Sequence, residues 1–114
     1  MQLRYDAGEI ITAMVTPFNK NLEIDFKGLE KLVKHLISNK SDAILVAGTT
    51  GESPTLTHEE ELELLKTVKN ISNKSCKVVM GAGSNSTQTA VEMTKKVTKG
   101  VNLSPISFLA LVAY

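Results

Sequence analysis

The chain has 114 residues, of which 42% are hydrophobic, so it holds enough material for one domain with a buried core. Charged residues make up 22% of the sequence and the formal net charge is +1, which disfavours binding to nucleic acid or anionic membranes through a basic field. Cys76 is the single cysteine, and residues 1–6 lack the apolar run of a signal peptide. We therefore expect a cytoplasmic protein without a disulfide or a membrane span.

Three short apolar runs predict β-strands, at 9–16, 43–47 and 78–80. The first run is followed by Pro17, which lacks the N–H group that a strand donates to its neighbour. The second run is apolar at every position, as is typical of a parallel strand that is covered on both faces. These runs predict the first strands of a parallel sheet.

Each predicted strand is followed by a segment with helical periodicity. Asp25 is expected to cap the first helix, and Thr57 with Glu60 has the spacing of a capping box at the start of the second. The third helix is expected to begin after Asn85 or Ser86. On the second and third helices, the residues predicted to face the core are Leu62, Leu65, Val68, Ile71, Ala90, Val91, Met93 and Val97.

The order β-α-β-α-β-α predicts an α/β fold with a parallel sheet built from βα units. An apolar run at 104–114 is a possible fourth strand, and no covering helix follows it. A (β/α)8 barrel needs about 250 residues. Three βα units and a possible fourth strand are therefore fewer than half of such a barrel, and we expect one domain over residues 1–114.

The loop after the second strand reads Gly48-Thr49-Thr50-Gly51-Glu52. Two hydroxyls and adjacent backbone N–H groups at the C-terminal end of a parallel strand are typical of a carboxylate or phosphate site. An alternative interpretation is a structural turn, in which the glycines supply unusual dihedral angles and the hydroxyls satisfy the loop backbone. The residue types alone leave both interpretations open.

Other chemically active side chains lack the partners that a catalytic or metal site requires. Glu52 is a candidate general base, but a lone carboxylate beside a helix start is typical of a structural role. His58 has no second histidine or cysteine at metal-ligand spacing, so we expect no metal. Cys76 has no histidine partner placed by the pattern. The glycines at 81–85 resemble a dinucleotide loop without its third glycine, which disfavours a Rossmann site.

Three stretches carry a resemblance to a known family. They are Ile11-Thr12-Ala13-Met14-Val15-Thr16-Pro17-Phe18, residues 42–57, and Gly81-Ala82-Gly83-Ser84-Asn85-Ser86-Thr87. In order and spacing they resemble dihydrodipicolinate synthase (4-hydroxy-tetrahydrodipicolinate synthase), of the pyruvate-dependent class I aldolase superfamily. N-acetylneuraminate lyase shares a Gly-x-Thr-Gly-Glu loop, but here two threonines followed by Glu-Ser-Pro-Thr-Leu-Thr favour the synthase.

The resemblance implies that the chain forms the first three βα units of a TIM (β/α)8 barrel, incomplete, with a possible fourth strand at its C-terminus. The family is usually a homotetramer and acts as a lyase in lysine and diaminopimelate biosynthesis. In that family pyruvate forms a Schiff base with a barrel lysine and then attacks L-aspartate 4-semialdehyde, and no cofactor is expected. The resemblance implies that Thr49 belongs to a proton relay and that Thr50 binds the pyruvate carboxylate. In lysine-inhibited members, an effector site at a subunit interface is lined by the positions that match Ser53, Pro54, His58 and Asn85.

The sequence also departs from the family pattern. The Schiff-base lysine, the tyrosine of the relay and a substrate-binding arginine belong to later strands of the family, and Lys77 stands at the wrong end of its strand to replace that lysine. Thr89 occupies the position where lysine-inhibited members have a glutamate, which disfavours lysine inhibition. Agreement with the family extends to about residue 96, so 97–114 is expected to be a divergent tail, and Tyr114 is assigned no role.

We therefore expect a truncated synthase fragment that is inactive alone. Three alternatives remain. The first is a non-catalytic remnant that aggregates or associates with full-length subunits, because an open parallel sheet leaves unpaired edges. The second is a fragment of an aldolase of the N-acetylneuraminate lyase type. The third is a small phosphate- or nucleotide-binding α/β module.

Overall fold

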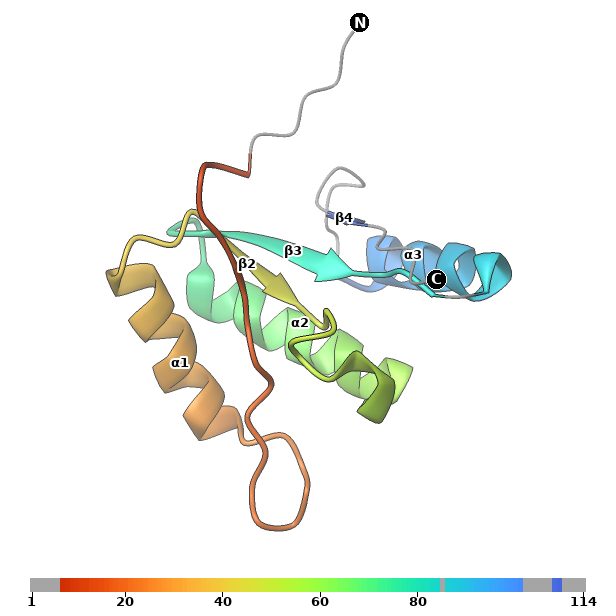
Figure 1. The fold of residues 1–114 in the computed structure, drawn as a ribbon, viewed down its shortest axis with the longest axis horizontal. Coiled ribbons are helices and arrows are strands. Elements are labelled where there is room, and N and C mark those ends of the chain that lie inside the picture. Colours follow the sequence, from red (N-terminus) through yellow and green to blue (C-terminus); the bar gives the residue numbers. More distant parts are fainter. Residues whose placement is uncertain (1–6, 85, 102–107, 110–114) are drawn as a thin grey trace, which may run out of the picture.

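The computed structural model describes residues 7–84, 86–101 and 108–109. Its strands form one parallel sheet in the order β1-β2-β3-β4, of which Figure 1 labels β2, β3 and β4. The predicted alternation of strands and helices is confirmed, with one short 3-10 helix, η1, in addition. In chain order the elements are β1 Ile11–Ala13, α1 Phe26–Ser38, β2 Ala43–Val46, η1 Ser53–Thr55, α2 His58–Ser72, β3 Lys77–Gly81, α3 Thr87–Val101 and β4 Phe108–Leu109.

β2 lies between β1 and β3, and its side chains form the centre of the core. Ile44 is in register with Thr12 of β1 and Val78 of β3, so these three side chains lie on the same face of the sheet. α1 and α2 lie side by side and pack on this face, where Leu29 of α1 and Leu65 of α2 are fully buried. Ile44 and Val46 are therefore fully buried, whereas Leu45 on the opposite face is only half-buried, so the predicted cover on both faces is only partly present.

β1 is shorter than the predicted strand over 9–16. Its ladder covers three residues, and the Met14 N–H then donates to the Leu45 carbonyl at 3.1 Å. Further along the chain, the Pro17 carbonyl accepts from the Asp25 N–H at 2.9 Å, and Asp25 caps α1. The ladder thus ends beside Leu45 of β2, and the Thr16 hydroxyl donates instead to the Gly51 carbonyl in the turn that follows β2.

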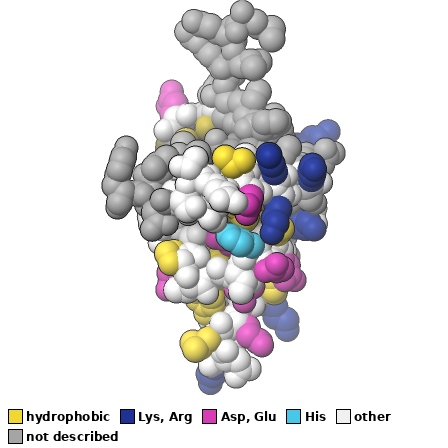
Figure 2. Space-filling view, turned by 90° about the vertical axis from the view of Figure 1, so that its right-hand side faces the viewer, with side chains coloured by type: hydrophobic (Ala, Val, Ile, Leu, Met, Phe, Trp, Pro, Cys, Tyr) yellow, Lys and Arg dark blue, Asp and Glu magenta, His cyan; other side chains and the backbone are white. Residues whose placement is uncertain are grey.

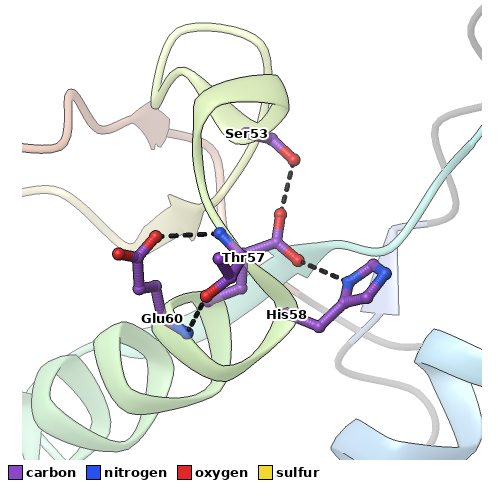
Figure 3. Close-up of polar contacts among 5 residues, drawn as sticks. Ser53, Thr57, His58 and Glu60 are labelled. Atoms are coloured by element: carbon purple, nitrogen blue, oxygen red, sulfur yellow. Dashed lines mark hydrogen bonds and ion pairs between the residues drawn. The ribbon is translucent and has the colours of Figure 1, made fainter.

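The predicted helix caps are confirmed where the structure describes them. Asp25 accepts from the Gly28 N–H at 3.0 Å. Thr57 accepts from the Glu60 N–H at 3.2 Å, and the Glu60 carboxylate accepts from the Thr57 N–H at 2.8 Å, which completes the capping box (Figure 3). Ser86 accepts from the Thr89 N–H at the start of α3. Asn85, the alternative cap, lies outside the described residues.

The buried faces of α2 and α3 differ from the prediction in part. Met93 and Val97 are buried as predicted, but Val91 is 47% exposed. On α2, Leu62 and Ile71 are only half-buried. The buried positions of that helix are Glu61, Leu64, Leu65, Val68 and Ser72. The buried face of α2 is rotated relative to the predicted one. It includes the polar residues Glu61 and Ser72, both hydrogen-bonded, which a purely hydrophobic pattern leaves out.

The apolar run at 104–114 contributes β4, whose two residues pair with the end of β3 in parallel. The rest of that run lies outside the described residues, so a longer fourth strand stays a prediction. No helix in the described ranges is long and apolar enough to cross a lipid bilayer. Basic and acidic side chains both lie on the face viewed in Figure 2, so neither sign of charge dominates that face.

Candidate active site

The turn between β2 and η1 brings the predicted threonines to the C-terminal edge of the sheet. Ala47 and Glu52, at the two ends of the turn, both have left-handed φ angles, of 54° and 57°. Such angles cost non-glycine residues free energy and persist only where the surrounding structure holds them. Three backbone hydrogen bonds close the turn. The Gly48 carbonyl accepts from the N–H groups of Gly51 at 3.1 Å and Ser53 at 3.3 Å, and the Thr49 carbonyl accepts from the Glu52 N–H at 3.0 Å.

Thr49 and Thr50 are exposed, and neither hydroxyl forms a hydrogen bond to another described residue. Their backbone N–H groups likewise donate to no residue within the described part of the chain. The turn is thus closed by the other three N–H groups. The interpretation in which these hydroxyls serve the loop backbone therefore loses its support, and four polar donors at one edge of the sheet have no partner among the described residues.

Thr16 holds the turn from the end of β1, a role that the sequence pattern did not predict. Its hydroxyl donates to the Gly51 carbonyl at 2.7 Å, and the residue is only 4% exposed. A Cβ at Gly51 would lie 3.1 Å from the Met14 carbonyl oxygen and 3.2 Å from the Thr16 hydroxyl oxygen, so a side chain there would crowd the end of β1. The end of β1 therefore holds the turn that follows β2.

A cavity of about 500 Å³ lies beside this turn, between the C-terminal ends of β2 and β3 and the helices α2 and α3. Its lining includes Thr49 and three of the four predicted effector-site residues, and Asn85, the fourth, lies outside the described residues. The lining residues are Ala47, Gly48, Thr49, Ser53, Pro54, Leu56, His58, Glu61, Gly81, Ala82, Gly83, Ser84, Thr89 and Met93.

Glu61 is a second residue that the sequence reasoning missed, and it is the most buried charged group of the cavity, 5% exposed. The Ser53 hydroxyl donates to one carboxylate oxygen at 2.6 Å, and His58 Nδ1 lies 3.3 Å from the other. Figure 3 shows Ser53 and His58 directed at this shared carboxylate. The sequence offered no signal for it, because Glu61 stands among glutamates that a helix start favours on electrostatic grounds.

The remaining sequence candidates, Glu52 and Cys76, lie apart from the cavity, and no group of metal ligands is found among the described residues. Glu52 is exposed and is not among the residues that line the cavity. Cys76 precedes β3 at the opposite end of the strand, and burial, with a contribution from Asp42, raises the pKa of its thiol. A raised pKa disfavours the reactive thiolate. Among the described residues, no three histidine, cysteine or acidic side chains gather as metal ligands.

These features define a class. Parallel βα units with exposed hydroxyl and N–H donors at the C-terminal edge are typical of part of a (β/α)8 barrel with its active-site loops. Residues 6–103 match the Dihydrodipicolinate synthetase family, and the chain belongs to that family. The family predicted from the three sequence stretches is confirmed.

Individual relatives agree with this assignment. The chain is 54% identical over 92 residues to 4-hydroxy-tetrahydrodipicolinate synthase of Oceanobacillus iheyensis, which covers 81% of this chain and 31% of that enzyme. The crystal structure of dihydrodipicolinate synthase from Bacillus anthracis matches at a TM-score of 0.81 and 49% identity, over 85% of this chain and 33% of that one. The pyruvate complex of the Acinetobacter baumannii synthase matches at 0.80 and 38% identity, over 83% and 33%.

The chain therefore spans about a third of the length of these relatives. The described βα units are consistent with part of their TIM barrel, as predicted.

Proposed function

We propose that this chain provides the pyruvate-carboxylate and proton-relay part of a dihydrodipicolinate synthase site. The reaction is the condensation of pyruvate with L-aspartate 4-semialdehyde in lysine biosynthesis. Thr50 binds the pyruvate carboxylate, and Thr49 passes protons during the imine chemistry. The observation that supports this most directly is the turn at 48–52, in which both threonine hydroxyls and both threonine N–H groups bond to no other described residue.

The chemistry of these donors suits a carboxylate. An anion gains from several N–H and O–H donors that converge on it, and hydrogen bonds to a charged group are about twice as strong as neutral ones. The turn does not reorganise to present them, because Thr16 and the three backbone bonds already hold it. A hydroxyl fixed in such a loop is also suited to short proton transfers beside the bound substrate.

In our proposal the chain by itself forms no imine. By family resemblance the lysine that forms the Schiff base belongs to a later strand. Lys77 lies at the N-terminal end of β3, opposite the turn, and its side chain is exposed. An amine that forms an imine near neutral pH is normally desolvated so that it loses its proton. Borohydride treatment in the presence of pyruvate should therefore leave the mass of the protein unchanged.

A chimera tests the proposed roles in a complete barrel. Residues 8–96 replace the matching segment of the O. iheyensis synthase, and condensation activity is measured. We expect activity in the chimera, and Thr50→Val should raise the KM for pyruvate about tenfold or more, the size expected for a lost hydrogen bond to a charged group. Thr49→Val should mainly lower kcat. Thr67→Val, on α2 with its hydroxyl bonded to the Glu63 carbonyl, is the control.

A folded chimera in which Thr50→Val leaves the KM for pyruvate unchanged would contradict the assigned role of Thr50. An adduct trapped on the isolated chain would contradict the absence of an imine-forming lysine.

The predicted effector site is a second proposal for the same region. Ser53, Pro54 and His58 all line the cavity. Thr89 lines it too, and its hydroxyl cannot supply the negative charge that a glutamate would offer to an ammonium group. We infer that lysine does not inhibit a barrel that contains this segment, so the chimera should keep its activity when lysine is added. Inhibition by lysine would refute this.

A non-catalytic partner of full-length subunits is the alternative function. It is favoured by the exposed apolar side chains near β1, whose single strand neighbour among the described residues is β2. They are Ile10, Ile11 and Val15. Apolar side chains at a free sheet edge favour association with another chain. Co-expression with a tagged full-length synthase tests it, and failure to co-purify with that synthase would exclude it.

A further inference from the structure

Side chains tie the turn that carries Thr49 and Thr50 to distant elements at two places. Thr16 holds it from the end of β1, through the Gly51 carbonyl. On its other side the turn continues directly into η1, where the Ser53 hydroxyl is bonded to Glu61 of α2. We propose that Glu61 is a positioning residue, which sets the geometry of the turn through Ser53. Its effect on pyruvate rests on the function proposed above, whereas its effect on the turn does not.

Glu61 is a rigid point of attachment. It belongs to the first turn of α2, which the capping box of Thr57 and Glu60 fixes at both backbone N–H groups. The carboxylate is nearly excluded from water, and a buried carboxylate is costly unless hydrogen-bonded. One oxygen accepts from Ser53 at 2.6 Å, a distance typical of a short charge-assisted bond. The buried carboxylate therefore keeps the Ser53 hydroxyl in one position.

The position of Ser53 is passed to the threonines through the backbone. The Ser53 N–H donates to the carbonyl of Gly48, which directly precedes Thr49. Between them, Glu52 has a left-handed φ of 57°. A non-glycine residue keeps such an angle only where its neighbours hold it there. Without the bond from Ser53 to Glu61, the end of the turn at Glu52 keeps the local bond from the Thr55 hydroxyl to the Glu52 carbonyl at 2.8 Å but loses its attachment to α2.

The neighbouring glutamates provide a matched control. Glu59 is one of the three acidic residues in the same first turn, is exposed, and forms no hydrogen bond or ion pair with any described side chain. Glu59→Gln therefore removes one negative charge from the helix start without touching Ser53. A change in amide exchange that Glu61 substitutions share with Glu59→Gln reflects the loss of a negative charge at the helix start. Only the additional change seen at Glu61 reports positioning of the turn.

The experiment measures amide hydrogen exchange by NMR on the full chain. In Glu61→Ala we expect the Gly51 and Ser53 amides to exchange about tenfold faster or more, the effect expected for losing a hydrogen bond to a charged group. The amides of β2 should change much less. Glu61→Gln keeps an oxygen that accepts from Ser53, so it should restore most of the protection. Glu59→Gln should match the wild-type chain.

A double-mutant comparison identifies the route. Ser53→Ala should reproduce the faster exchange, and adding Glu61→Ala to it should change the turn little further, because both variants remove the same bond. Positioning through Ser53 is refuted if Glu61→Ala speeds amide exchange equally in the turn and in β2. It is also refuted if Glu61→Ala speeds exchange in the turn as strongly when Ser53 is already alanine. Should Glu61→Ala fail to fold, Ser53→Ala and Glu61→Gln still decide the matter.

A pyruvate titration on the same samples separates the two proposals. With both correct, pyruvate shifts the Thr49 and Thr50 amide resonances of the wild-type chain, and Glu61→Ala weakens this binding severalfold while Glu61→Gln does not. If pyruvate causes no shift in the wild-type chain, the proposed function fails, whereas the exchange result still stands for Glu61. If exchange in the turn is unchanged by Glu61→Ala, the positioning role fails, whatever pyruvate does.

Discussion

Replacing Thr16 with valine tests how the end of β1 holds the turn after β2. Valine has nearly the same shape as threonine, so the substitution removes the hydroxyl that donates to the Gly51 carbonyl at 2.7 Å and leaves no sizeable cavity. Both residues are buried, so water does not readily replace the lost donor. An unsatisfied buried polar group costs about 1–3 kcal/mol, and we expect Thr16→Val to lower the free energy of unfolding by this amount.

Urea denaturation followed by far-UV circular dichroism measures this change. With a slope of about 1 kcal/mol per molar urea for a small domain, the midpoint should fall by about 1 M or more. Thr50→Val is the matched control, because its exposed hydroxyl bonds to no described residue, and it should stay within about 0.5 kcal/mol of wild type. Equal effects of the two variants would refute the claim that the Thr16 bond secures the turn.

Three further predictions concern stability. Thr57→Ala removes half of the capping box, and should lower the free energy of unfolding by about 0.5–2 kcal/mol in the same urea assay. In Gly81→Ala the new Cβ would lie 2.6 Å from the Ala47 carbonyl oxygen, so the melting temperature should fall. An unchanged melting temperature would contradict the close approach of Gly81, at the end of β3, to Ala47, which follows β2. The pKa of Cys76 is raised in the folded protein, so the contribution of its thiol to stability is present below the ordinary thiol pKa and is lost as pH rises above it. The free energy of unfolding should therefore decline at alkaline pH, and Cys76→Ser should make this decline less steep. Denaturation at several pH values measures it.

Elements whose signals lie within a few residues were predictable from the sequence. A cap needs a side-chain oxygen and an N–H group three residues later, and both Asp25 and Thr57 act as predicted. The continuous apolar run at β2 likewise predicted burial, which holds for Ala43, Ile44 and Val46, while Leu45 is half-buried. The family motifs around Thr16 and Thr49 were likewise legible, because they are contiguous stretches of sequence.

The features that hold the candidate site join residues far apart in the chain. Thr16 and Gly51 are 35 positions apart, and they meet only because β1 and β2 pair in one particular register. Glu61 is identical in type to Glu59 and Glu60, and only the packing of α2 beside η1 separates the buried carboxylate from the exposed one.

The amino-acid sequence by itself determined the order of strands and helices, their caps and the family, because each is encoded in local spacing and contiguous motifs. Tertiary structure alone decided that Val91 is exposed, that Glu61 is buried, and that Thr16 and Glu61 hold the turn from two sides. The physical reason is that burial and long-range hydrogen bonds depend on which elements pack together, and sheet register and helix rotation set this packing.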